Sequence, residues 1–116
     1  MGSKELLQKY FNKLIADGAS QKSISVAMGY DHPNNISMLL SDTCPKSLIS
    51  PDKIPMLCNV CNLSAVEAIV FTLVRVGESD GSTIRISKAT LKFLFMQFGR
   101  LTIEHFKLKN DGATPC

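Results

Sequence analysis

Two neighbouring amides, Asn34 and Asn35, stand where the apolar pattern of a short helix begins, in the segment GYDHPNNISMLLS at residues 29–41. If Ile36 points to the core, a step of about 100° per residue places Asn34 and Met38 on the opposite face. The side chains flanking this face are Asn35, Ser37 and Ser41. The predicted face therefore carries amides, hydroxyls and a methionine, and no charge.

An uncharged helix face of this kind has a specific chemical use. Asn can pair with both N6 and N7 of adenine, Ser can donate or accept, and Met can lie on a thymine methyl group. We therefore expect contacts to DNA bases from Asn34, Asn35, Ser37 and Met38. The alternative interpretation is that Pro-Asn-Asn is ordinary turn and first-turn chemistry, because Asn favours both positions.

The elements that would position this face are helices. Their apolar residues recur at helical spacing, and serines, glycines and an asparagine mark their ends. We expect Ser3 to cap the first helix, Ser20 to precede the second and the SAVE segment at 64–67 to form a capping box. The expected helices are 3–17, 21–28 (burying Ile24, Ala27 and Met28), 33–40 (burying Ile36, Leu39 and Leu40), 52–61, 64–76 and 87–107, the last preceded by a short strand at 83–86.

The run SQKSISVAMGYDHPNNISMLLS, followed by PDKIPMLCNVCNLS, resembles the Cro/repressor (XRE-like) family of DNA-binding domains over residues 6–63. On this resemblance Gln21 opens the second helix, Ala27 (or Ser25) is its small residue, Gly29 starts the turn and Ile36 anchors the third helix. The resemblance implies an all-α, lambda-repressor-like helix-turn-helix bundle of about five helices. A long C-terminal helix would follow it.

The resemblance also implies phosphate contacts, because a polar pair at the start of the second helix holds a phosphate in that family. The expected phosphate-binding residues are Ser20, Gln21, Lys22, His32, Ser41 and Lys46. The loop after the third helix departs from the family pattern, since it offers only Lys46 beside Asp42. Affinity should therefore be modest for each protomer, and a dimer would be needed.

Composition sets weaker limits on function. The chain has 116 residues and a formal charge of +3, and six basic residues face five acidic ones up to Lys53. This balance permits a polyanionic partner without requiring one. No run is long enough to span a membrane and no secretory signal is present, so we expect a cytoplasmic protein, and the resemblance implies that it is bacterial or phage-encoded. The sequence has no nucleophile–base pair or phosphate loop, so we expect neither an enzyme nor a bound cofactor.

The four cysteines allow two interpretations. Cys58 and Cys61 have the spacing of a metal or redox motif, and Cys44 with His32 could complete a zinc site. On the fourth helix, however, both cysteines share the apolar face and would behave as small buried hydrophobes. We expect the second interpretation to hold, with no metal, and with Cys116 exposed at the terminus.

The final helix is apolar nearly all round, so it must be buried on more than one side. The domain before it could cover one face and a second copy of the chain another; the alternative is burial wholly within one chain. The predicted two-fold interface comprises Ile84, Ile86, Leu91, Leu94, Phe95, Phe98, Leu101 and Thr102, with Phe93, Met96, Ile103 and Phe106 on other faces and His105 exposed or at the interface. The expected organisation is a helix-turn-helix domain at 1–76, a linker at 77–82, an oligomerisation segment at 83–107 and a tail at 108–116.

These expectations combine into a transcription regulator, a repressor that binds an inverted-repeat operator as a homodimer. Its half-sites would lie about one helical turn apart. The principal alternative is an interaction protein with the same fold, such as an antitoxin, an anti-activator or a phage-encoded inhibitor, because fold alone does not determine function. A thiol-sensing regulator is a third and weaker hypothesis.

Overall fold

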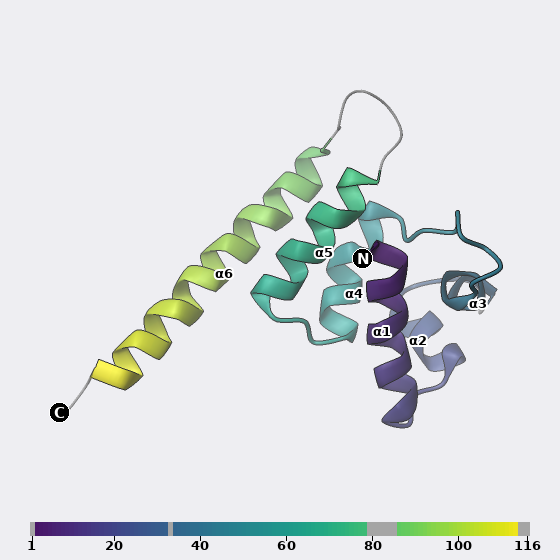
Figure 1. Ribbon diagram of the computed structural model, residues 1–116, viewed down its shortest axis with the longest axis horizontal. Helices are drawn as coiled ribbons and strands as arrows, with labels where there is room; N and C mark the ends of the chain where they lie inside the picture. The colour runs from purple at the N-terminus through teal and green to yellow at the C-terminus, as the bar shows by residue number, and fades with distance from the viewer. Residues whose placement is uncertain (1, 33, 79–85, 114–116) are drawn as a thin grey trace.

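The computed structural model describes residues 2–32, 34–78 and 86–113, and side chains of the last helix through residue 106. Within these ranges the chain forms a compact all-α globule without strands, in which a long C-terminal helix runs along the fifth and extends beyond it (Figure 1). The elements are α1 (Ser3–Ala16), α2 (Gln21–Ala27), α3 (Asn34–Leu40), the 3-10 turn η1 (Pro51–Lys53), α4 (Ile54–Val60), α5 (Ala65–Gly77) and α6 (Lys88–Ala113).

Local signals explain most helix ends. Ser20 and Ser64 each accept a hydrogen bond from the backbone N–H three residues later, and both form full capping boxes. After α1, α2 and α4 the chain passes through left-handed residues, with φ of 111° at Gly18, 75° at Gly29 and 50° at Asn62. Glycine and asparagine tolerate this conformation best, so these chain reversals were predictable.

The core lies where α1 to α5 meet. Phe11 from α1 and Phe71 from α5 are fully buried, and the rings of Tyr10 and Phe71 lie 6.2 Å apart between centroids. Close packing of this kind makes the cluster sensitive to lost volume. The buried cluster comprises Leu7, Phe11, Ile24, Met28, Ile36, Leu39, Ile49, Ile54, Leu57, Cys58, Leu63, Ala68 and Phe71.

The expected cap of α1 is wrong. Ser3 lies inside the helix and is buried, and Gly2 occupies the capping position without a side-chain hydrogen bond. The backbone N–H of Ser3 donates to Glu78 Oε2 at 3.0 Å, and the Ser3 hydroxyl donates to the other carboxylate oxygen. A carboxylate from the end of α5 therefore satisfies first-turn donors of α1, where negative charge is favourable.

Two other expectations need correction. Ala27 is exposed, and Ser25 is the buried small residue of α2, since its hydroxyl donates to the carbonyl of His32 at 3.2 Å. The last helix continues to Ala113 rather than ending at residue 107, so most of the expected tail is helical. Asn and Gly disfavour helix only weakly compared with Pro, which the chain next offers at position 115. The expected start at Pro33 and strand residues 83–85 lie outside the described residues.

Candidate nucleic-acid interface

The third helix presents its uncharged face to solvent, as the sequence predicts. Ile36 is fully buried and Leu39 is nearly so, while Met38 is 48% exposed. Leu40 is half-buried, in part agreement with its expected burial. The remaining predicted base-contacting residues Asn34, Asn35 and Ser37 are all exposed. One side of α3 therefore anchors it in the core and leaves the amides and hydroxyl accessible.

Helix α1 holds the C-terminal end of α3. Lys4 Nζ donates to the carbonyl of Met38 at 2.9 Å, and Gln8 Nε2 donates to the carbonyl of Leu40 at 3.1 Å. The last carbonyls of a helix lack intrahelical partners and carry partial negative charge, so an ammonium and an amide there stabilise the end. Further bonds from Lys4 to the carbonyl of Ser47 and from Gln8 to Asp42 secure the following loop.

The turn between α2 and α3 is held from two directions. Asn35 contacts the carbonyl of His32 through both its backbone N–H and its side-chain amide, each at 3.3 Å. Lys53 Nζ donates to the carbonyl of Met28 at 3.1 Å and lies 5.1 Å from the centre of the Tyr30 ring, a cation–π geometry. Asn35 of α3 and Lys53 of η1 thus hold the turn, while Lys4 and Gln8 of α1 hold the other end of α3.

The exposed face of α3 continues onto the start of α2. The hydroxyl of Ser37 donates to Gln21 Oε1 at 2.8 Å, which joins a predicted base-contacting residue to a predicted phosphate-binding residue. Ser20 and Lys22 beside it are exposed. The Ser20 hydroxyl accepts from the backbone N–H of Ser23 at 3.0 Å and so completes the end of its own helix.

The other predicted phosphate-binding residues lie around α3. His32 is exposed in the turn before it, and Ser41 is half-buried after it, with its hydroxyl 2.7 Å from that of Thr43. Lys46 is exposed and lines a shallow, largely apolar groove. The groove residues are Met38, Cys44, Pro45, Lys46 and Ser47.

Sequence reasoning missed the part played by Lys4, Gln8 and Lys53. All three are polar residues that a sequence would assign to solvent, yet each donates to a carbonyl at or beside an end of α2 or α3. Because their partners are 25 to 34 residues away, no local pattern points to them. The sequence offers one local hint: Lys4 and Gln8 are four residues apart on α1, a spacing that places them on the same face of the helix.

Cys58 of α4 is buried as expected, whereas Cys61, which directly follows α4, is only half-buried. Burial raises the pKa of the Cys58 thiol to about 11, an effect partly offset by the nearby Arg100 guanidinium. Burial, with the neighbouring Cys58 and Glu67, raises the pKa of Cys61 to about 12. In the part of the chain that the structure describes, no three His, Cys, Asp or Glu side chains are grouped closely enough to hold a metal ion.

These thiols predict an alkaline loss of stability. In the unfolded chain they should ionise near the ordinary value of 9.0, whereas Cys58 and Cys61 in the fold retain their protons to about 11 and about 12. The unfolded state then binds fewer protons, so the free energy of unfolding should fall as pH rises from 9 towards 12. The raised pKa values of Tyr10 and Tyr30 act in the same direction above their ordinary value of 10.0.

The measurement is guanidinium unfolding at a series of pH values. A Cys61→Ala variant should show a shallower decline above pH 9 than the parent, whereas Cys44→Ala in the loop after α3 serves as the matched control. Equal declines in the parent and Cys61→Ala would contradict the assignment.

The predicted dimer residues fall into two groups on α6. Leu91, Phe95, Phe98 and Thr102 are exposed, and so is Ile86 before the helix. Leu94 is only 5% exposed and Leu101 is half-buried, on the face that packs against α5. Leu94 is thus a core residue of its own chain and is withdrawn from the predicted interface. Ile84 lies outside the described residues.

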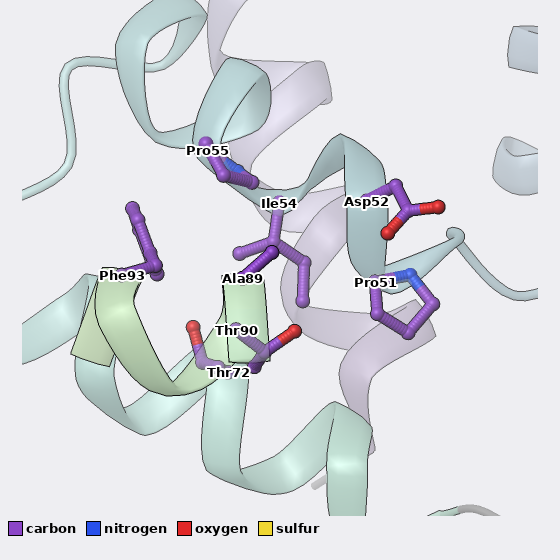
Figure 2. Close-up of a pocket in the computed structure, with 8 residues that line it drawn as sticks. All are labelled: Pro51, Asp52, Ile54, Pro55, Thr72, Ala89, Thr90 and Phe93. Atoms are coloured by element: carbon purple, nitrogen blue, oxygen red, sulfur yellow. The ribbon is translucent and has the colours of Figure 1, made fainter. Parts of the chain in front are cut away.

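A small cavity lies where α6 joins the globule. Figure 2 shows Ala89, Thr90 and Phe93 of α6 facing residues of η1, α4 and α5 across it. Its volume of about 90 Å³ is well below the roughly 300 Å³ at which ligand pockets begin. This cavity is therefore a packing gap rather than a candidate ligand site. The lining residues are Pro51, Asp52, Ile54, Pro55, Thr72, Ala89, Thr90 and Phe93.

Comparison with known proteins finds no matching family model, no matching curated protein and no matching solved structure. Within the described residues, none of the helices combines the length and the apolar character that crossing a membrane requires. Function must therefore be inferred from the geometry of the α2–α3 surface and of α6.

Proposed function

We propose that this chain is a sequence-specific DNA-binding transcription regulator, a repressor that binds an inverted-repeat operator as a homodimer. In this proposal α2 and α3 form the helix-turn-helix of a lambda-repressor-like fold, and α3 enters the major groove. One observation carries the proposal: α3 is locked to the core by Ile36 while its opposite face exposes only uncharged polar side chains and Met38.

The chemistry of that face favours a base edge over solvent. A solvated helix face gains solubility from charged side chains, and α3 has none. Asn34 and Asn35 each offer a donor and an acceptor, as adenine N7 and N6 require. Rigid attachment strengthens the case, because Lys4 and Gln8 hold the far end of α3 and a groove-binding helix needs a fixed orientation.

Phosphate contacts would come from the rim of the same face. Gln21 touches Ser37, and exposed Lys22 lies next to it at the start of α2, while exposed Lys46 follows α3. Lys4 and Lys53 donate to backbone carbonyls and so contribute less to a phosphate surface. Lys22 and Lys46 are then the main cations on the rim that could contact phosphates. So small a number supports modest affinity for each protomer and operator binding as a dimer.

The test is a mobility shift with duplexes from upstream of the coding sequence, at about 50 mM salt, against a random duplex of equal length. We expect retention of an upstream fragment and weaker retention of the random one. If no duplex is retained at low salt, the DNA proposal is wrong.

The salt dependence gives a residue-level prediction for the two lysines. Replacing Lys22 or Lys46 by Gln should weaken binding to all sequences alike. It should also reduce the slope of log K against log salt by about 0.9 for each phosphate that the variant no longer neutralises. Lys9→Gln, an exposed site on α1, is the matched control. Unchanged slopes in both variants would remove these lysines from the phosphate surface.

A second candidate function is binding to a protein partner through the same fold. The apolar groove between Met38 and the loop at 44–47 favours it, because Met-lined grooves accept apolar side chains. The two candidates differ in the residues that they require: a partner protein would need Pro45, which lies outside the predicted DNA-contacting residues, and would not need Asn34. A Pro45→Glu variant that retains DNA binding but loses a co-purifying protein would support this second function.

A further inference from the structure

Helix α6 carries an exposed apolar stripe along its length. Leu91, Phe95, Phe98 and Phe106 are 45%, 67%, 48% and 63% exposed. At about 100° per residue these side chains and Thr102 fall within about 80° of one another, opposite half-buried Phe93. Phe93 lines the cavity beside η1 and α4, so the stripe points away from the globule.

Helix α5 carries a matching stripe. Val66, Val70 and Leu73, spaced by four and three residues, are each about half exposed. At about 100° per residue they point about 100–160° away from Phe71, which belongs to the core shared with α1. Phe71 of α5 and Phe93 of α6 face the globule, and the two helices pack side by side in opposite directions (Figure 1), so we infer that the stripes on their other sides share the outer side of the pair. We name this surface the outer face: Val66, Val70, Leu73, Leu91, Phe95 and Phe98.

We propose that the outer face binds a second copy of this chain, so that α5 and α6 of two protomers form a four-helix assembly. The interface would be isologous, with the same patch contributed by both copies. The proposal adds Val66, Val70 and Leu73 of α5 to the surface, and of the residues expected from sequence it keeps Leu91, Phe95 and Phe98 at the centre. It rests on the proposed function only for the use of the dimer at an inverted-repeat site.

The exposed apolar area approaches the size that a stable dimer needs. Roughly 150–200 Å² for a fully exposed side chain of these types gives on the order of 650 Å² for the outer face together with Phe106 of the same stripe. A standard interface buries about 800 Å² per partner, whereas the largest apolar patch on a typical monomer is about 300–600 Å². The area therefore lies above the range that a solitary chain ordinarily exposes and near the share of one partner in a standard interface.

Charge also favours a second copy over a partner recognised by charge. The outer face itself contains no charged residue, so it matches its own apolar copy without charge complementarity. Lys88 and Lys92 lie at the N-terminal end of α6, at the edge of the stripe. If the two α6 helices run antiparallel, these lysines approach the C-terminal end of the partner helix, where positive charge is favourable.

Gly99 supports a helix crossing near the middle of α6. It faces outward beside Phe95 and Phe98, and a Cβ built on it would meet no atom within 4 Å. A glycine in a helix interior lowers stability by about 1 kcal/mol relative to Ala, and packing within one chain does not explain why a glycine stands here. Where a helix crosses its own symmetry mate, a missing side chain permits close approach of the backbones.

The test is the mass of the full chain without DNA, by sedimentation or light scattering across concentration. We expect a dimer for the parent and a loss of about 100-fold or more in self-affinity for Phe95→Glu and for Leu73→Glu, because each buries unpaired charge. Val26→Glu, at a site 71% exposed on α2, is the matched control and should remain dimeric. Circular dichroism shows whether each variant retains its helices.

Separate outcomes overturn separate parts of the proposal. A parent chain that stays monomeric at high micromolar concentration, or that associates only with lipid vesicles, refutes the second copy as the occupant. If Phe95→Glu is monomeric but folded Leu73→Glu stays dimeric, α5 is not part of the interface. Since no DNA is present, failure here is distinguishable from failure of the mobility shift.

Discussion

The Asn34→Ala/Asn35→Ala double variant is expected to bind its operator at least about 30-fold more weakly than the parent. A bidentate amide–adenine pair contributes about 1–3 kcal/mol of discrimination, and the variant removes two such amides from each protomer. Both side chains are exposed and the Asn35 amide gives up one hydrogen bond, to the carbonyl of His32, so the free energy of unfolding should fall by no more than about 1.5 kcal/mol. Mobility shift and thermal unfolding measured on the same preparations separate the two quantities.

The single variants should differ. The Asn35 amide donates to the carbonyl of His32 at 3.3 Å and must give up that bond to contact a base, so we expect the larger loss from Asn34→Ala. Asn12→Ala/Asn59→Ala, at exposed sites on α1 and α4, is the matched control for removing two amides. Operator affinity that the α3 double variant leaves intact would exclude base contacts from this face.

Phe71→Ala is expected to lower the free energy of unfolding by about 3–5 kcal/mol. Phe71 is fully buried and packs 6.2 Å from the ring of Tyr10, so its removal leaves a cavity at the junction of α1 and α5. The loss is a large share of the about 5–15 kcal/mol that typically stabilises a domain. Guanidinium unfolding followed by circular dichroism gives the value.

Two further variants complete that measurement. Val70→Ala, one residue earlier and 46% exposed, should change the stability of the dilute chain by less than about 1 kcal/mol. If Phe71→Ala does not fold, Phe71→Leu keeps most of the volume and should still be measurably less stable. A change below about 1 kcal/mol for folded Phe71→Ala would place Phe71 outside the critical core.

The helices were predictable because their signals are local. Ser20 and Ser64 act on N–H groups three residues away, and Asn62 and Gly18 reverse the chain through their own backbone conformation. The exposed face of α3 was predictable for the same reason. Once Ile36 points inward, helical geometry determines where its neighbours point, and only the roles assigned to them go beyond that geometry.

The errors have a common physical origin. Ser3 is a sound local cap, but Glu78, 75 residues away, satisfies the first turn instead. Leu94 and Phe95 are adjacent apolar residues of similar size, and only the position of α5 leaves one 5% and the other 67% exposed. A sequence shows that α6 is apolar on several sides without showing which side its own chain covers.

The amino-acid sequence by itself determined the helices, most of their ends and the inward and outward sides of α3, because each depends on residues within one or two turns. Only the tertiary structure decided which carbonyls Lys4 and Gln8 hold, and that an apolar face remains open across α5 and α6. Those features join segments that are distant in the chain. Their energies depend on packing and on the removal of water at contacts that no local pattern encodes.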